Sequence, residues 1–202
     1  MSKPTSEIAR LGEALTAAFE AHGVRVSENL QPGLAKSKIL RIAEPLGFDL
    51  PPEVIDLYRW KNGHIDDEDS SLHRLVTFRD NAFLSLERGI EEHFEMRKYY
   101  GTEEATLERV GVDMRTCFPI GAFMGSWTAV ACGKHKYGKS AKYPVINVFQ
   151  GYDYYFDSVT AMLKTCVGWV SSPEWEQFGG LPDEIEGRLW KLHNPNRPRY
   201  GA

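Results

Sequence analysis

The segment from residue 46 to residue 63 contains a helix whose two ends are both marked by the sequence, and it limits the fold more than any other segment. Pro52 stands in the first turn, where its missing backbone N–H would have no partner, and Glu53 follows at the positive end of the helix dipole. Lys61 and Gly63 supply a cation and a residue that tolerates a left-handed stop. Most side chains between these ends are apolar, so we expect protein to cover most of the helix.

Hydrophobic periodicity divides the rest of the chain into helices and strands. Apolar residues at helical spacing predict helices over residues 6–22, 34–46, 159–170 and 183–192, and weaker patterns predict a polar helix around 90–98 and a short one over 102–110. Runs rich in Val, Ile, Tyr and Phe predict strands over residues 72–78, 82–86, 116–120, 126–132, 143–149 and 152–156. Short turns between these strands favour an antiparallel sheet. The predicted fold class is α+β, with helices packed against the sheet and extra helices at both termini.

Length and composition indicate one large domain with appended segments. A chain of 202 residues can form a single core, and a hydrophobic content of 42% excludes wholesale disorder. We divide the chain into an N-terminal helical extension over residues 1–33, an α+β domain over 34–171 and a C-terminal extension over 172–202. Apolar stripes in both extensions predict that they pack on the domain.

Charge and sorting signals exclude several classes of protein. A formal net charge of −4 lacks the clustered Lys and Arg that neutralise phosphates, so we expect no direct binding of DNA or RNA. Residues 1–6 lack the apolar segment of a secretory signal, and no run approaches the roughly 18 apolar residues of a membrane span. The three cysteines include no close pair, which argues against a disulfide framework. We expect a cytoplasmic protein that does not bind membranes.

One motif raises an enzymatic alternative. Residues 133–140 match G-x-x-x-x-G-K-[ST], the loop that cradles phosphates in nucleotide hydrolases. That mechanism needs a helix directly after Lys139, because the amides at its N-terminus hold the phosphates. Pro144 and a β-branched run follow instead, which predicts a hairpin loop between two strands. A nucleotide hydrolase that uses Lys139 and Ser140 is the competing hypothesis.

The remaining reactive side chains do not form a recognisable site. The six histidines show no ligand spacing, and the polar surroundings of His93 predict an exposed side chain. Cys132 and Cys166 lie in apolar patterns that are typical of inert core thiols. The acidic run at residues 66–69 lacks the alternating ligands and central glycine of an EF-hand. We therefore expect no catalytic residue, no metal and no cofactor.

Three short motifs, taken in order, resemble the SMI1/KNR4 domain of the SUKH superfamily. They are Leu50-Pro51-Pro52-Glu53 with the terminal Asn62-Gly63, Phe118-Pro119-Ile120-Gly121 at a strand entry, and Tyr155-Phe156-Asp157-Ser158 before a helix. The resemblance covers roughly residues 35–170 and implies an α+β meander. It also implies protein binding, because members are similar in serving mainly as immunity proteins that sequester toxins, often nucleases. Fungal relatives act in cell-wall and growth signalling.

The resemblance favours a non-enzymatic protein that binds and neutralises a cognate bacterial toxin. An acidic surface can occupy a nuclease site built to receive phosphate, so the expected partner is a basic toxin domain. A regulatory adaptor without a toxin partner is also compatible with the sequence. The expected partner-binding residues lie at the end of the core helix, in the acidic run and on the last strand: Trp60, Asn62, Asp66, Asp67, Glu68, Asp69, Tyr152 and Tyr154.

Overall fold

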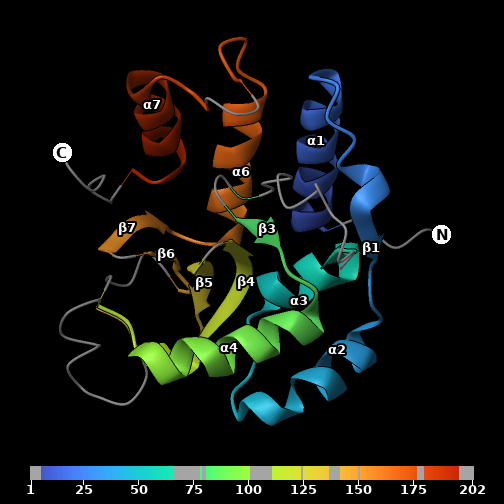
Figure 1. The fold of residues 1–202 in the computed structure, drawn as a ribbon, viewed down its shortest axis with the longest axis vertical. Coiled ribbons are helices and arrows are strands. Elements are labelled where there is room, and N and C mark those ends of the chain that lie inside the picture. The colour runs from blue at the N-terminus through green and yellow to red at the C-terminus, as the bar shows by residue number, and fades with distance from the viewer. Residues whose placement is uncertain are drawn as a thin grey trace.

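The fold is α+β, as the sequence predicts, with helices at both ends of the chain (Figure 1). The computed structural model describes residues 6–65, 78, 81–100, 111–123, 125–136, 142–149, 151–176 and 180–195. The helices are α1 (Glu7–Ala21), α2 (Lys36–Ala43), α3 (Pro52–Trp60), α4 (Leu86–Tyr100), α6 (Val159–Val170) and α7 (Asp183–His193). The strands are β1 (Leu30–Pro32), β2 (Lys61–His64), β3 (Ala82–Phe83), β4 (Cys117–Phe123), β5 (Ser126–Ala131), β6 (Val145–Phe149) and β7 (Gly151–Phe156).

Five of the strands form an antiparallel meander. Their order is β3-β4-β5-β6-β7, so neighbours in the sheet are also neighbours in the chain. This confirms the predicted antiparallel sheet and its last four strands to within a few residues. The strands β1 and β2 form a separate two-stranded sheet that the sequence did not predict. The predicted helix over residues 102–110 and most of the predicted strand over 72–78 lie outside the described residues.

The core helix ends differently from the prediction. We expected Lys61 and Gly63 to close it in a left-handed turn, but α3 ends at Trp60 and Lys61 is already extended, with φ −145° and ψ 149°. Gly63 takes a positive φ of 75° within β2. A Cβ atom at Gly63 would lie 2.2 Å from the backbone nitrogen of Ser85, so the close approach of the two backbones requires glycine. Long-range strand pairing therefore overrides the local end signals.

The five-stranded sheet has a hydrophobic core on each face. Val130 and Val145 belong to a core that also holds apolar residues of α1, α3 and α6. Their neighbours Ala129 and Ile146 belong to a second core with Met96 of α4. This alternation follows from the two-residue period of a strand. Figure 1 shows α1, α6 and α7 above the sheet and α4 below it.

Helix starts are fixed by side chains, and one of them is fixed from a distant part of the chain. The sequence leaves Asp157 or Ser158 as the N-cap of α6, and the structure shows Ser158, whose hydroxyl accepts a hydrogen bond from the backbone nitrogen of Ala161 at 3.1 Å. Glu53, in the first turn of α3, accepts hydrogen bonds from the backbone nitrogen of Val159 at 3.0 Å and from the hydroxyl of Thr160. The carboxylate of Glu53 therefore holds the beginnings of α3 and α6 together.

The terminal helices share the core of the domain. Helix α1 packs on α3 and α6 and buries Leu15, while α7 packs on α6 and buries Trp190. After α7, the amide oxygen of Asn194 accepts from the backbone nitrogen of Asp157 at 2.9 Å, and its nitrogen donates to Thr165 at 3.2 Å. The N-terminal segment also contributes β1, which pairs with β2. No helix in the described part of the chain is long and apolar enough to cross a membrane.

His93 corrects the prediction of an exposed side chain. Its ring is fully buried between α4 and β4, with Nδ1 2.8 Å from the carbonyl oxygen of Cys117, so Nδ1–H is the donor. The rings of Phe48 and Phe94 lie 5.4 and 5.3 Å from it, between centroids. Polar neighbours along the helix suggested exposure, but His93 and Met96 share the face of α4 that lies on the sheet. Burial lowers the pKa of His93.

Candidate functional site

An open groove of about 630 Å³ lies where the two-stranded sheet meets α2 and the beginning of α4. Its volume falls within the range of known ligand-binding sites. Both strands of the small sheet and both helices contribute to its lining, which consists of Gln31, Pro32, Gly33, Leu34, Lys38, Asn62, Ile65, Ser85 and Glu87. The groove is therefore built by two parts of the chain, residues 31–38 and residues 62–87.

The floor of the groove is held by hydrogen bonds around the start of α4. The amide oxygen of Asn62 accepts from the backbone nitrogen of Leu86 at 3.0 Å, and its nitrogen donates to Glu87 at 3.3 Å. The hydroxyl of Ser85 accepts from the backbone nitrogen of Arg88 at 3.1 Å. Asn62, a predicted partner-binding residue, is buried and uses its side chain within the fold.

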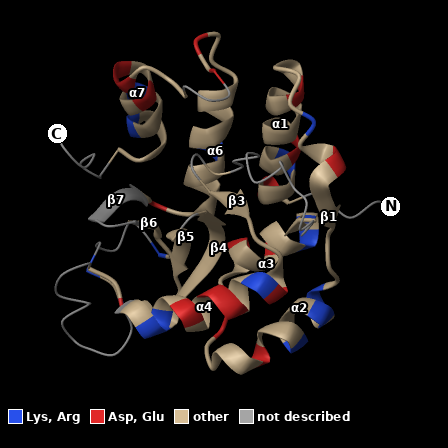
Figure 2. Cartoon of the chain, in the orientation of Figure 1, with Lys and Arg blue, Asp and Glu red and all other residues tan. Residues whose placement is uncertain are grey.

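The two walls of the groove carry opposite charges. Lys38 is an exposed residue of α2, and it forms no ion pair with any residue that the structure describes. Glu87 is exposed on the opposite wall, in the first turn of α4. Figure 2 shows basic positions along α2 and both acidic and basic positions along α4. Burial lowers the pKa of the adjacent His64 to about 4, so this imidazole adds no charge near pH 7.

The rim of the groove includes an apolar contact surface and a close backbone approach. Ile65 is 52% exposed, and it is one of the large hydrophobic side chains on the described surface. At Gly33 a Cβ atom would lie 2.0 Å from the carbonyl oxygen of Arg59, so glycine lets the rim pack directly on the end of α3. The groove thus has both charged and apolar side chains, and its rim packs directly on α3.

Trp60, a second predicted binding residue, lies in the core. Its indole nitrogen donates to Glu13 of α1 at 2.8 Å, and its ring stacks on Phe83 with centroids 6.3 Å apart. A Cβ atom at Gly12 would lie 2.5 Å from the indole, so α1 covers this ring closely. The packing of α1 on the end of α3, which connects residues far apart in the sequence, explains why the tryptophan is not at the surface.

The other predicted binding residues lie in two separate places. Residues 66–69 are outside the described residues, but the chain enters them from Ile65 on the rim of the groove. Tyr152 and Tyr154 belong to β7, where Tyr154 pairs with Asn147 of β6. Strand β7 ends the sheet order opposite to β3, four strand spacings or roughly 19 Å away. The strand with the two tyrosines is therefore not part of the groove, which lies beside the β3 edge.

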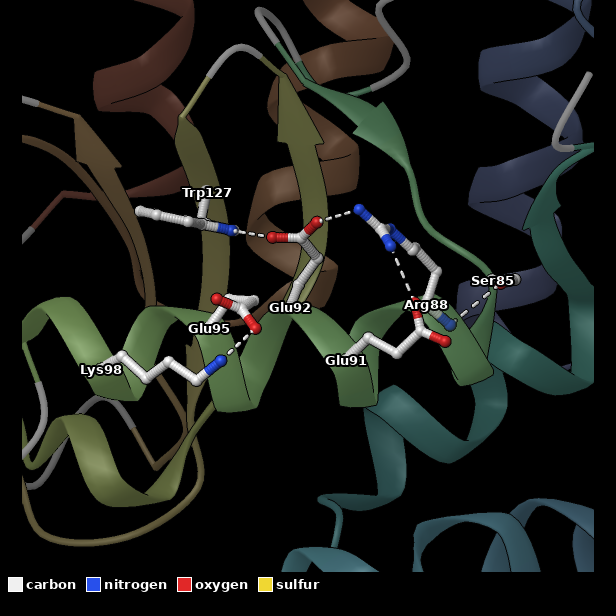
Figure 3. A network of polar contacts seen from close by, with 7 residues as sticks. All are labelled: Ser85, Arg88, Glu91, Glu92, Glu95, Lys98 and Trp127. Atoms are coloured by element: carbon white, nitrogen blue, oxygen red, sulfur yellow. Dashed lines mark hydrogen bonds and ion pairs between the residues drawn. The ribbon is translucent and has the colours of Figure 1, made fainter. Parts of the chain in front are cut away.

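A network of polar contacts fixes α4 to the sheet next to the groove (Figure 3). Arg88 pairs with Glu91 at 2.8 Å and with Glu92 at 2.7 Å. Glu92 also accepts a hydrogen bond from the indole nitrogen of Trp127 on β5 at 2.7 Å. Only 14% of the Glu92 side chain is exposed, so this contact is poorly screened by solvent. Glu87, which directly precedes Arg88, therefore belongs to a helix that is fixed to the sheet.

Sequence reasoning missed Lys38 and Glu87 as site residues. Lys38 lies on the polar face of a predicted amphipathic helix, and Glu87 precedes the predicted polar helix, so neither stood out from other surface charges. Lys38 and Glu87 line the same groove because α2 packs on α4 in the tertiary fold. No local sequence pattern carries that information.

The phosphate-loop motif lies in a hairpin connection, as predicted. Strands β5 and β6 on either side of it are antiparallel neighbours, with Val130 opposite Val145. Lys136 donates its backbone N–H to Gly111 at 2.7 Å, and residues 142–144 lead directly into β6. Lys139 and Ser140 are outside the described residues. The next element in the described residues is the strand β6, whereas the nucleotide mechanism needs a helix directly after the lysine.

The fold is an α+β domain with an open groove beside its two-stranded sheet. Within the described residues, no group of three or more His, Cys, Asp and Glu side chains is placed to hold a metal ion. The model of the SMI1 / KNR4 family (SUKH-1) matches residues 33–165, and the chain belongs to this family. The match begins at Gly33 on the groove rim and ends within α6, so α1 and α7 lie outside it. No curated protein matches the chain in a sequence comparison.

Proposed function

We propose that this protein is a non-enzymatic immunity protein, which binds a cognate bacterial toxin and holds it inactive. The SUKH family includes immunity proteins, and its domains are generally non-catalytic binding domains. The observation that carries the proposal is the preformed groove with walls of opposite charge, from which the chain continues directly into Asp66, Asp67, Glu68 and Asp69.

The rigidity of the groove supports a binding function. Asn62 is fixed by two hydrogen bonds, and Glu92 connects α4 to the sheet through Trp127. A surface that is ordered before binding loses less conformational entropy when a partner docks. A preformed groove of this kind favours tight association without a catalytic step.

Charge supports a basic partner. The chain has a formal net charge of −4, and the four acidic residues at positions 66–69 follow the exposed Ile65. Concentrated acidic charge steers a basic surface toward the groove and speeds association. A nuclease toxin, whose site is built to receive phosphate, has such a surface. Trp60 and Asn62, which are buried, would stabilise the part of the fold that carries this contact. Tyr152 and Tyr154 would form a separate contact at β7.

The proposal is tested by searching the genes beside this one for a toxin-like reading frame and co-expressing its product with this chain. The wild-type chain should restore growth, and replacement of residues 66–69 by lysines should abolish the protection. A control for the position of a charge reversal is Glu184→Lys, which reverses one exposed charge on α7, far along the chain from the groove. This control should protect as well as the wild type.

Two outcomes would contradict parts of the proposal. Failure of the soluble, well-expressed wild-type chain to protect would exclude the immunity function and leave the regulatory adaptor. Full protection by the lysine variant would show that the contact surface lies outside the acidic run. The strand from Tyr152 to Phe156 would then be mutated next. Micromolar binding of ATP that depends on Lys139 would restore the enzymatic alternative.

A further inference from the structure

The two charged walls of the groove differ in the sign of their charge and in the contacts that hold the charged side chain. Glu87 is fixed by the Asn62 amide at 3.3 Å, in the first turn of α4. Lys38 extends from α2 and forms no ion pair within the described part of the chain. Pro32, Leu34 and Ile65 of the lining add apolar surface. A ligand in this groove meets a cation on one side and an anion on the other.

We infer that the groove binds an extended segment of the partner protein, with an acidic side chain facing Lys38 and a basic side chain facing Glu87. The inference rests on the proposed protein-binding function and names the part of the partner that is recognised. Opposite charges at the two walls match such a segment in one direction. A reversed segment would place like charges against both walls, so the groove also sets the orientation.

The chemistry of the lining favours a polypeptide over a small metabolite. Sites for small molecules are mostly apolar and place a few convergent polar groups toward the ligand. Here the buried polar side chains of the lining, Asn62 and Ser85, already have partners within the fold. The groups left for a ligand are exposed side chains on an open rim. Such groups suit side-chain contacts along an extended chain.

The test uses random linear peptides displayed on phage and selected against the full-length protein. We expect enriched peptides that share one acidic and one basic residue at a constant separation and in a constant order. The double variant Lys38→Glu/Glu87→Lys should enrich peptides with the two charges in reverse order. Either single reversal should weaken binding of a wild-type-selected peptide about tenfold or more.

The matched control exchanges another pair of opposite charges on α4. Glu95 and Lys98 pair with each other on the exposed surface, with 51% and 67% of their side chains exposed. The variant Glu95→Lys/Lys98→Glu keeps the net charge and should select the same peptides as the wild type. Equal melting temperatures of the wild type and both double variants establish that the fold is retained.

The outcomes separate this inference from the proposed function. Failure to enrich any peptide above an unrelated protein, or selection of the same peptides by the groove-swapped variant, would overturn the inference. If peptides bind as expected while toxin protection fails, the groove is confirmed and the immunity function is wrong. If protection succeeds while peptide selection fails, the toxin is held elsewhere and the inference about the groove is wrong.

Discussion

Glu53 acts at the start of two helices at once. Its carboxylate lies in the first turn of α3 and accepts hydrogen bonds from Val159 and Thr160 at the start of α6. Glu53→Ala should lower the free energy of unfolding by about 2 kcal/mol, because a charge-assisted pair is lost and a backbone N–H is left without its partner. Asp56→Asn, which removes an exposed ion pair with Arg59, should change it by less than about 0.5 kcal/mol. Urea unfolding measures both, and equal effects would contradict the role of Glu53.

Two histidines make stability depend on pH. Burial lowers the pKa of His93, and it lowers the pKa of His64 to about 4, both from 6.5. The unfolded chain therefore binds protons that the folded chain does not, so stability is full above about pH 6.5 and falls as the pH drops toward 4. For His64 the free energy of unfolding falls by roughly 3 kcal/mol over this range. The charge of Arg97 acts in the same direction on His93.

His93→Asn tests the contribution of the buried imidazole. An asparagine amide can still donate to the carbonyl of Cys117, but it does not titrate. The variant should lose less stability than the wild type when urea unfolding is compared at pH 7.5 and pH 5. An equal loss in both proteins would show that His93 does not take up a proton on unfolding in this range.

At the scale of elements, the approach of α4 to the sheet depends on Gly89. A Cβ atom there would lie 2.8 Å from the carbonyl oxygen of Pro119 and 2.9 Å from Phe118. Gly89→Ala should therefore destabilise the fold by about 1–3 kcal/mol, although alanine favours a helix by about 1 kcal/mol. Gly168→Ala in α6 is the control, because a Cβ atom there would lie at an ordinary contact distance of 3.6 Å from Leu189. This variant should stabilise the fold. If the melting temperature changes in the same direction in both variants, this account of the packing is wrong.

Local signals predicted the elements that they control. The apolar stripe of α6 and its Ser158 cap lie within a few residues of each other, and the meander from β4 to β7 follows from short turns. The strands β1 and β2 were missed, because they are short and their extended conformation comes from pairing such as Leu30 with His64. The groove was missed for the same reason. Its floor residue Asn62 was named as a partner-binding residue, but it is buried, and the wall residues come together only in the tertiary fold.

At the scale of the molecule, α1 and α7 belong to the same core as the family domain. Leu15, Phe19 and Trp190 are buried in one cluster with residues of α3 and α6. A fragment of residues 30–172 would expose this apolar surface, at about 25 cal/mol per Å². It should melt at a lower temperature than a fragment of residues 6–195, or aggregate. Equal melting temperatures of the two fragments would show that the terminal helices add nothing to stability.

Neutralisation by binding and neutralisation by chemistry differ in stoichiometry. A protein that sequesters a toxin must be present in at least equal amount, whereas an enzyme that modifies or degrades it acts at a small fraction of that amount. The groove, its fixed floor and its opposed charges favour the first mechanism.

The most direct measurement is therefore a titration of the purified toxin domain with this protein, with the activity of the toxin as the readout. We predict that activity falls in proportion to the protein added and reaches zero at one equivalent, and that it returns when high salt separates the complex. Complete loss of activity at a small fraction of an equivalent, or full activity in the presence of excess protein, would contradict an immunity protein that acts by binding.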